Sequence, residues 1–204
     1  MAYSASFTAG GILFNEFEAI LPYIQQVGIK DFLQQEVRDN LYLKINTESA
    51  RKRVVTELKK RIEAVNMDFW QHYAAVSAEE RKKLLFFLCC KSYQLVWDFH
   101  FKVTLPGFWA YRHEADFFPY KMYLDELASK DETVNGWSES TKKKCITNYI
   151  RMLNETGIVQ NGKLQKSEVE YEFYRFFING NEPWALDIFL LNNDEKQTVL
   201  NYCK

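Results

Sequence analysis

Glycine, proline, histidine and cysteine are all scarce in this sequence. Eight glycines and four prolines among 204 residues argue against a β-sandwich rich in turns and against a long disordered tail. The four cysteines, Cys89, Cys90, Cys145 and Cys203, have neither a Cys-x-x-Cys spacing nor a histidine at the spacing of a metal ligand. We therefore expect reduced thiols and no metal site.

Long hydrophobic runs are absent as well. The longest is Leu84–Cys90, seven residues, whereas a membrane-spanning helix needs roughly 20. The first twenty residues contain no lysine or arginine before their short apolar stretch, and Glu16 and Glu18 follow it, which is not the pattern of a secretory signal. We expect a cytoplasmic protein that does not enter a membrane.

Motifs of catalysis and of phosphate binding are missing too. His72, His100 and His113 have no partner at the spacing of a metal site or a nucleophile relay. The Gly-Gly pair at 10–11 is not followed by a phosphate-binding loop or a dinucleotide-binding turn. Asp98 lies near His100 in the sequence, but the two are not placed for acid–base catalysis. We expect a protein that is not an enzyme and has neither a cofactor nor a small-molecule substrate.

What the sequence does have is many aromatic residues and a clear helical periodicity. It contains 16 Phe, 12 Tyr and five Trp, and aromatic side chains bury much surface each. Apolar residues recur every three or four positions, and Ser77 with Glu80 fits a capping box. We therefore predict a mainly α-helical fold. In the first half the predicted helices run from Phe14 toward Gly28, over Lys30–Leu43, from a cap at Thr47 or Ser49 to Val65, and from Ser77 to about Phe101. In the second half they run over Tyr120–Leu127, from a cap at Ser138 or Ser140 to about Glu155, over Glu168–Ile178 and Trp184–Leu191, and after the Asn192–Asp194 cap.

Two local signals interrupt the helical pattern. Asn161-Gly162 lies between two short β-type runs, which favours a type I′ hairpin. Leu105-Pro106-Gly107 interrupts the preceding helix, and Lys130–Gly136 reads as a polar loop. We place a division at the proline, giving an N-terminal helical domain of residues 1–105 and a C-terminal domain of residues 106–204.

An internal repeat links the two halves. When the chain is shifted by 91 residues, Thr47–Thr56 aligns with Ser138–Thr147. Each segment has a hydroxyl, Glu, Ser, a small residue, three cations, two apolar residues and Thr, in that order. Chance similarity between two capped amphipathic helices is the alternative explanation.

Cations and short hydroxyl side chains gather on one face of each repeated helix. At 100° per residue they lie opposite the apolar stripe, in a row suited to phosphates and base edges, and the first turn of the helix offers backbone N–H groups to a phosphate. The candidate DNA-binding residues are Ser49, Lys52, Arg53, Thr56 and Lys60 on the first helix, Ser140, Lys143, Lys144, Thr147 and Arg151 on the second, and Lys163 and Lys166 in and after the hairpin.

Local charge agrees with this assignment. The whole chain has a formal charge of −1, so nothing global indicates a nucleic-acid binder. Residues 51–65 nevertheless contain six cations against two acids, and residues 138–166 again contain six against two. Positive potential is therefore concentrated on two elements. A merely solvated helix face is the alternative.

The order of the elements around each basic helix matches that of known DNA-binding motifs. In the first half a helix, a short connection and the basic helix follow the order of a helix-turn-helix. In the second half a helix, a loop, the basic helix and the hairpin follow the order of a winged helix, with the hairpin as the wing. The fold predicted is thus a tandem of helix-turn-helix-like halves, the second of them a winged helix.

Three segments resemble a known family. They are Tyr3–Phe14, Ser49–Val55 and Trp137–Val159, and they resemble BrxA, a small protein of the BREX bacterial anti-phage systems. The resemblance spans most of the chain and weakens after about Lys166. It implies a cytoplasmic, mostly helical, non-enzymatic DNA-binding protein that works beside other BREX proteins. The family has also been likened to the RNA-binding antitermination protein NusB.

These observations support one main hypothesis and two alternatives. The main hypothesis is a monomer that binds double-stranded DNA through phosphate contacts from two basic helices and a wing, with strong salt dependence. The first alternative is a scaffold or adaptor that holds partner proteins of the defence system by acidic and aromatic surfaces. The second is an RNA-binding protein similar to NusB.

Overall fold

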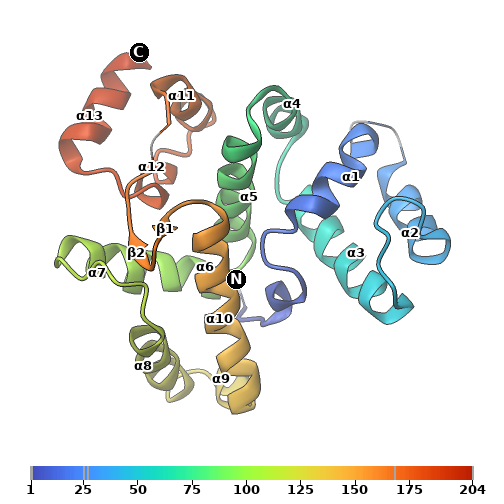
Figure 1. Ribbon diagram of the computed structural model, residues 1–204, viewed down its shortest axis with the longest axis horizontal. Helices are drawn as coiled ribbons and strands as arrows, with labels where there is room; N and C mark the ends of the chain where they lie inside the picture. The colour runs from blue at the N-terminus through green and yellow to red at the C-terminus, as the bar shows by residue number, and fades with distance from the viewer. Residues whose placement is uncertain (1, 25, 27, 168, 204) are drawn as a thin grey trace.

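The computed structural model describes residues 2–24, 26, 28–167 and 169–203, and nearly all of its elements are helices (Figure 1). The elements are the 3₁₀-helix η1 (Ser6–Ala9), α1 (Phe14–Ile24), α2 (Ile29–Asp39), α3 (Glu48–Glu63), α4 (Met67–Ala75), α5 (Ala78–Ser92), α6 (Gln94–Asp98), the π-helix η2 (Phe99–Thr104), α7 (Leu105–Trp109), α8 (Phe117–Ala128), α9 (Glu132–Asn135), α10 (Glu139–Glu155), β1 (Val159–Gln160), β2 (Lys163–Leu164), α11 (Tyr171–Asn179), α12 (Ala185–Ile188) and α13 (Asn193–Tyr202). The predicted mainly α fold with a short hairpin is confirmed.

Side-chain caps start the long helices where the sequence indicates. The Thr47 hydroxyl accepts the Ala50 N–H at the start of α3, and the Ser138 hydroxyl accepts the Thr141 N–H at the start of α10. Ser77 and Glu80 form the predicted capping box of α5. Such caps satisfy N–H groups that have no partner inside the helix. Of the alternatives Thr47 or Ser49 and Ser138 or Ser140, the first of each pair is therefore the cap.

The helices form three groups around α5 and α6 (Figure 1). The first, α1–α3, lies at the right, and α8–α10 lies below α5 and α6 in the same view. The third group, α11–α13, covers the opposite upper side. Buried side chains from all three groups belong to a contiguous core, which includes Leu58 of α3, Leu88 of α5, Tyr149 of α10 and Phe177 of α11. The predicted division into residues 1–105 and 106–204 stays a prediction.

Helix boundaries near the middle of the chain differ from those predicted. A single helix from Ser77 to Phe101 was wrong: the helix stops at Tyr93, whose backbone is extended (φ −131°, ψ 115°). Leu105-Pro106-Gly107 does not interrupt the helical path either, since η2 leads directly into α7. Pro106 is tolerated there because it lies in the first turn of α7, where no helical N–H bond is required.

Four other elements also differ from the prediction. The Lys130–Gly136 segment contains a short helix, α9, capped by Asp131, which accepts the Val134 N–H. The sequence pattern missed α4 altogether. Helix α2 ends at Asp39, before the predicted Leu43. The predicted start of the eleventh helix, Glu168, lies outside the described residues, and α11 begins at Tyr171.

The predicted hairpin is present and is held in place by a neighbouring segment. Val159 pairs with Leu164 and Gln160 with Lys163. Asn161 (φ 52°) and Gly162 (φ 76°) are both left-handed, as a type I′ turn requires. Residues 113–115 run alongside: the Leu164 N–H donates to the His113 carbonyl, and the Ala115 N–H donates to the Gly162 carbonyl. Backbone hydrogen bonds therefore hold the hairpin on two sides, between its own strands and to residues 113–115.

Candidate nucleic-acid interface

Helix α3 divides into a buried face and an exposed face. Val54, Val55 and Leu58 are buried, and each contributes about 1.5–3 kcal/mol by leaving water. Ser49, Lys52, Arg53 and Thr56 are exposed on the other side, as the 100° spacing predicts. The position of the exposed row is therefore fixed by the packing of the buried one.

The exposed side chains of α3 differ in their ion pairs and hydrogen bonds. Arg53 has no ion pair or hydrogen bond within the described part of the chain. Lys52 pairs with Glu48 at 2.6 Å, and both side chains are more than half exposed, so the pair contributes little and opens easily. The Thr56 hydroxyl donates to the Lys52 carbonyl at 2.8 Å and keeps its lone pairs for an incoming donor.

Two arginines of α3 form hydrogen bonds within the protein and are not free at the surface. Arg51 donates to the carbonyls of Val37 and Ile45, both at 2.8 Å, and so ties the α2–α3 connection to α3. Arg61 is fully buried, and its Nε donates to the Tyr93 hydroxyl at 2.9 Å. Counting these residues as surface charge, as the sequence argument did for residues 51–65, overstates the cationic surface of this helix.

The side chain of Lys60 is partly buried. Its ammonium nitrogen lies 4.0 Å from the centre of the Tyr93 ring, a cation–π distance. Burial lowers the pKa of Lys60, against the opposing effect of Glu57. Of the residues predicted to contact DNA on α3, it is therefore the least available.

Helix α10 repeats the arrangement of α3. Cys145, Ile146 and Tyr149 are buried. The residues predicted for DNA contact, Ser140, Lys143, Lys144, Thr147 and Arg151, are all exposed. No ion pair joins Lys143 or Lys144 to any residue that the structure describes.

Hydrogen bonds along α10 match hydrogen bonds along α3. Thr147 donates to the Lys143 carbonyl at 2.9 Å, as Thr56 donates to that of Lys52. Each pair occupies the same place in the 91-residue shift. The caps Thr47 and Ser138 are related by the same shift, so the repeat found in the sequence corresponds to two helices of like local structure.

Arg151 has partners but stays at the surface. Its Nε lies 3.4 Å from a Glu155 carboxylate oxygen, and its guanidinium donates to the Asn148 amide oxygen at 2.8 Å. Burial raises the pKa of Glu155, opposed by Arg151 and by the Ile12 N–H. Gly11 lies against the same guanidinium: a Cβ on Gly11 would be 2.7 Å from Nη2. No local sequence pattern indicates this contact, because Gly11 and Arg151 are far apart in the chain.

The hairpin and the chain beyond it contribute unequally. Lys163 is exposed on β2, next to the turn. Lys166 is half-buried and pairs with Glu195 of α13 at 2.7 Å. Lys166 is thereby tied to the C-terminal helices, while Lys163 remains at the wing.

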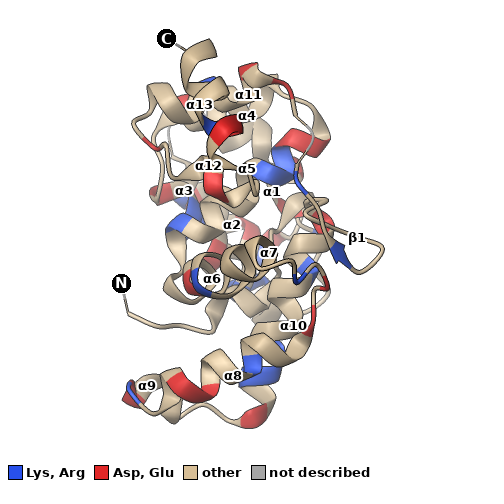
Figure 2. Cartoon of the chain, turned by 90° about the vertical axis from the view of Figure 1, so that its left-hand side faces the viewer, with Lys and Arg blue, Asp and Glu red and all other residues tan. Residues whose placement is uncertain are grey.

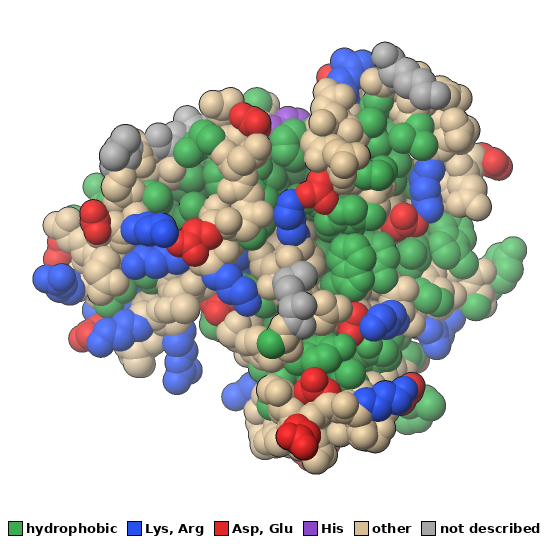
Figure 3. Space-filling view, turned by 180° about the vertical axis from the view of Figure 1, so that it is seen from behind, with side chains coloured by type: hydrophobic (Ala, Val, Ile, Leu, Met, Phe, Trp, Pro, Cys, Tyr) green, Lys and Arg blue, Asp and Glu red, His purple; other side chains and the backbone are tan. Residues whose placement is uncertain are grey.

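Charge is unevenly distributed over the surface. In Figure 2 both cations and acidic residues lie on α8 and α9, and a cation lies on the hairpin. From behind, lysine and arginine side chains gather over the lobe of α1–α3, with some acidic side chains among them (Figure 3). η1 contacts both α3 and α10 and lies between them (Figure 1).

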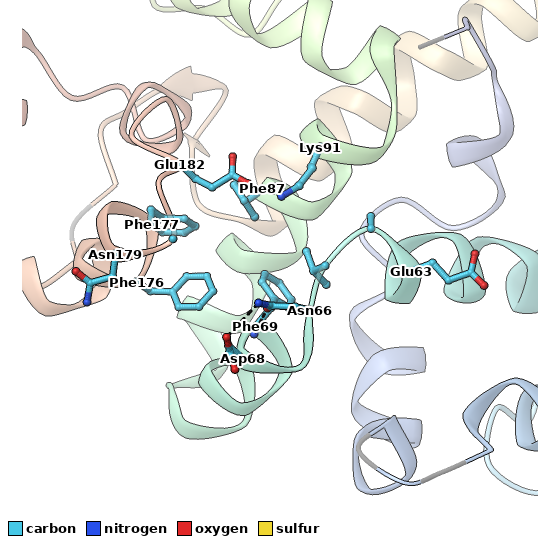
Figure 4. A pocket seen from close by; sticks show the side chains of 13 residues that line it. Glu63, Asn66, Asp68, Phe69, Phe87, Lys91, Phe176, Phe177, Asn179 and Glu182 are labelled. Carbon is cyan, nitrogen blue, oxygen red and sulfur yellow. Dashed lines mark hydrogen bonds and ion pairs between the residues drawn. The ribbon is translucent and has the colours of Figure 1, made fainter.

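A cavity of about 600 Å³ lies elsewhere, between α4, α5 and α11 (Figure 4). Its wall includes the aromatic rings of Phe69, Phe87 and Phe176. Four of its polar side chains form two pairs: Lys91 bonds to Glu182, and the Asn66 amide donates to Asp68. None of the candidate DNA-binding residues lines it.

The histidine and acid considered for catalysis are held apart by other partners. His100 is buried, its Nδ1 lies 2.9 Å from the Tyr149 hydroxyl, and burial lowers its pKa to about 4. Asp98 accepts hydrogen bonds from Tyr3 and Tyr123. The described residues contain no cluster of three or more His, Cys, Asp or Glu able to hold a metal ion. They also contain no helix long and apolar enough to cross a bilayer.

Comparison with known proteins identifies the family. The BrxA family model matches residues 1–179 of this chain. The chain belongs to the BrxA family. The resemblance carried by Tyr3–Phe14, Ser49–Val55 and Trp137–Val159 is thereby confirmed.

Curated BrxA relatives match over most of the chain. The BREX protein BrxA of Paramagnetospirillum magneticum is 20% identical over 187 residues, which cover 90% of this chain and 94% of the relative. The BREX protein BrxA of Bacillus cereus is 23% identical over 166 residues, covering 79% and 80%. A crystal structure of an uncharacterized protein from Magnetospirillum magneticum superposes with a TM-score of 0.78 at 21% identity, covering 93% of this chain and 99% of that one. This chain thus shares its fold with a solved structure.

Proposed function

We propose that this member of the BrxA family is a non-enzymatic component of a BREX system that binds double-stranded DNA. Contacts to the backbone phosphates would come from α3, α10 and the wing. The observation that carries the proposal is the matched pair of exposed rows on α3 and α10, with Arg53 and Lys144 free of partners among the described residues. No carboxylate among the described residues pairs with either of these two cations, so both would attract a polyanion.

The order of the elements around α3 and α10 supports double-stranded DNA as the ligand. In the order α8, α9, α10, β1, β2, α10 occupies the place of the recognition helix of a winged helix, and Lys163 lies on the wing. The short helix α9 lies in the segment predicted to be a loop, and it gives this half three helices before the hairpin. The order α2, connection, α3 repeats the helix-turn-helix frame in the first half.

Affinity would come mainly from phosphates and would fall with salt. The candidate residues include six exposed cations, Lys52, Arg53, Lys143, Lys144, Arg151 and Lys163, which would give a slope of log K against log salt of about −5. Sequence preference would be weak, because phosphate contacts carry no base information. The protein would act in the cytoplasm, as a monomer, beside other BREX proteins.

The decisive experiment is charge reversal with a matched control. The variant Arg53→Glu/Lys144→Glu changes the charge by the same amount as Lys30→Glu/Lys130→Glu, and Lys30 and Lys130 are exposed lysines outside the proposed interface. Duplex titrations at low salt should show loss of binding for the first variant and near-native binding for the second. Equal behaviour of the two variants would contradict the proposal. A preference for structured RNA in direct competition would favour the alternative similar to NusB.

A second candidate function, that of an adaptor for partner proteins, has one observation in its favour. Phe118 and Met122 lie one turn apart on α8 and are 65% and 58% exposed, and exposed apolar neighbours often mark protein contacts. Phe118→Ser/Met122→Ser should then abolish co-purification with other BREX proteins while duplex binding persists.

A further inference from the structure

A buried carboxylate joins the start of the chain to both halves of the fold. Asp98, at the end of α6, is fully buried. Its Oδ2 accepts hydrogen bonds of 2.7 Å from Tyr3 and from Tyr123 of α8. Its Oδ1 accepts from Gln94 at 2.9 Å and lies 3.0 Å from the Lys102 ammonium. A buried charge is stable only with such partners, so Tyr3 is one of the groups that this carboxylate needs.

The residues after Tyr3 continue between the two basic helices. Phe7, in η1, is fully buried, and its ring centre lies 5.7 Å from that of Tyr93. The Tyr93 hydroxyl in turn bonds to Glu57 and Arg61 of α3. Through Phe7 the segment therefore packs against the side chain that anchors α3.

Farther along, the same segment meets α10. Gly11 has a left-handed backbone (φ 64°), and the space where its side chain would be is filled by the Arg151 guanidinium. The next residue, Ile12, presents its N–H to Glu155 at the end of α10. The segment thus contacts α10 on the side that bears one of the residues proposed for DNA contact.

We infer that the segment Tyr3–Leu13, here called the N-terminal strap, fixes the orientation of α3 relative to α10, with Tyr3 and Gly11 as its positioning residues. Tyr3 holds one end at the Asp98 carboxylate, and Gly11 allows the other end to seat Arg151. The role in DNA binding rests on the proposed function; the role in orienting the helices does not. Preorganised contact groups bind a rigid ligand more tightly because less freedom is lost on binding.

Spin-label distances test this directly. Labels on Glu48→Cys and Glu139→Cys, at the starts of α3 and α10, report the relation of the two helices, with Cys203→Ser present throughout to remove a partly exposed native thiol. We expect a single narrow distance distribution in the parent protein. Tyr3→Phe, which removes only the hydroxyl, should widen it by several ångströms, and Tyr3→Phe/Gly11→Ala should widen it further. An unchanged distribution in the double variant would overturn the inference.

The control is a tyrosine outside the strap. Tyr171 is 46% exposed on α11, and its hydroxyl bonds to none of the residues that the structure describes. Tyr171→Phe should leave the distribution unchanged. If it widens the distribution as much as Tyr3→Phe does, the effect is not specific to the strap and the inference fails.

Duplex titration of the same proteins separates the two proposals. Tyr3→Phe, which changes none of the residues proposed to contact DNA, should weaken DNA binding by roughly fivefold. If the parent protein binds no duplex, the proposed function fails, and the spin-label distances still decide whether the strap orients the helices.

Discussion

The ammonium nitrogen of Lys60 lies 4.0 Å from the centre of the Tyr93 ring. This contact makes Lys60 unlike Arg53 two turns before it, although the sequence predicts the same role for both. We expect Lys60→Gln to lower duplex affinity clearly less than Arg53→Gln. Titration at several salt concentrations measures the difference: Arg53→Gln should reduce the salt slope by about one. A reduction of equal size for Lys60→Gln would show that its ammonium leaves the ring on binding.

The buried polar group beneath Lys60 gives a prediction about stability. The Tyr93 hydroxyl joins the carboxylate of Glu57 to Nε of Arg61, and all three residues are buried. Tyr93→Phe removes this link and leaves two buried charges with fewer partners. Urea denaturation should show a loss of about 2–3 kcal/mol in the free energy of unfolding.

The matched change Tyr171→Phe, at an exposed ring, should cost only a few tenths of a kcal/mol. A loss of similar size in both variants would mean that the hydroxyl of Tyr93 contributes little.

Much of the fold could be predicted from local sequence signals. The caps Thr47, Ser77 and Ser138 and the Asn161-Gly162 turn act through hydrogen bonds and backbone angles within a few residues, so the information is local. The helix break at Tyr93 is different. Its extended backbone accompanies hydroxyl contacts to residues 32 and 36 positions earlier, which no local pattern reveals.

The candidate site shows the same limit. The helical spacing correctly predicted that Arg53 and Lys144 are exposed. It could not separate them from Arg61, which is buried, or from Lys166, which pairs with Glu195 across 29 residues. Counting charges along the chain gives each cation equal weight, whereas tertiary partners decide which cations a ligand can reach.

The wing offers a test based on backbone strain. Gly162 has φ 76° with no heavy atom near the position of a Cβ, so Gly162→Ala adds strain without a clash. The cost should be about 1 kcal/mol, and the displaced turn should weaken duplex binding through Lys163. The measurements are thermal unfolding and duplex titration on the same samples.

Gly28 is the matched control for this change. It is also left-handed (φ 92°), also has open space around it, and lies at the start of α2. Gly28→Ala should cause a similar loss of stability with no loss of DNA affinity. If both variants bind DNA equally well, the wing does not take part in binding.

His100 should make the protein less stable in mild acid. Burial lowers its pKa to about 4, whereas an unfolded histidine has a pKa of about 6.5. Between these values the unfolded chain binds the additional proton, so stability falls as the pH drops from about 6.5 to 4. Urea denaturation should give a free energy of unfolding about 2 kcal/mol lower at pH 5 than at pH 7 from this group. His100→Gln should remove that part of the pH dependence, while His113→Gln, at a partly exposed position, should retain it. A pH dependence unchanged in His100→Gln would assign the effect to other groups, such as His72, whose pKa is also lowered by burial.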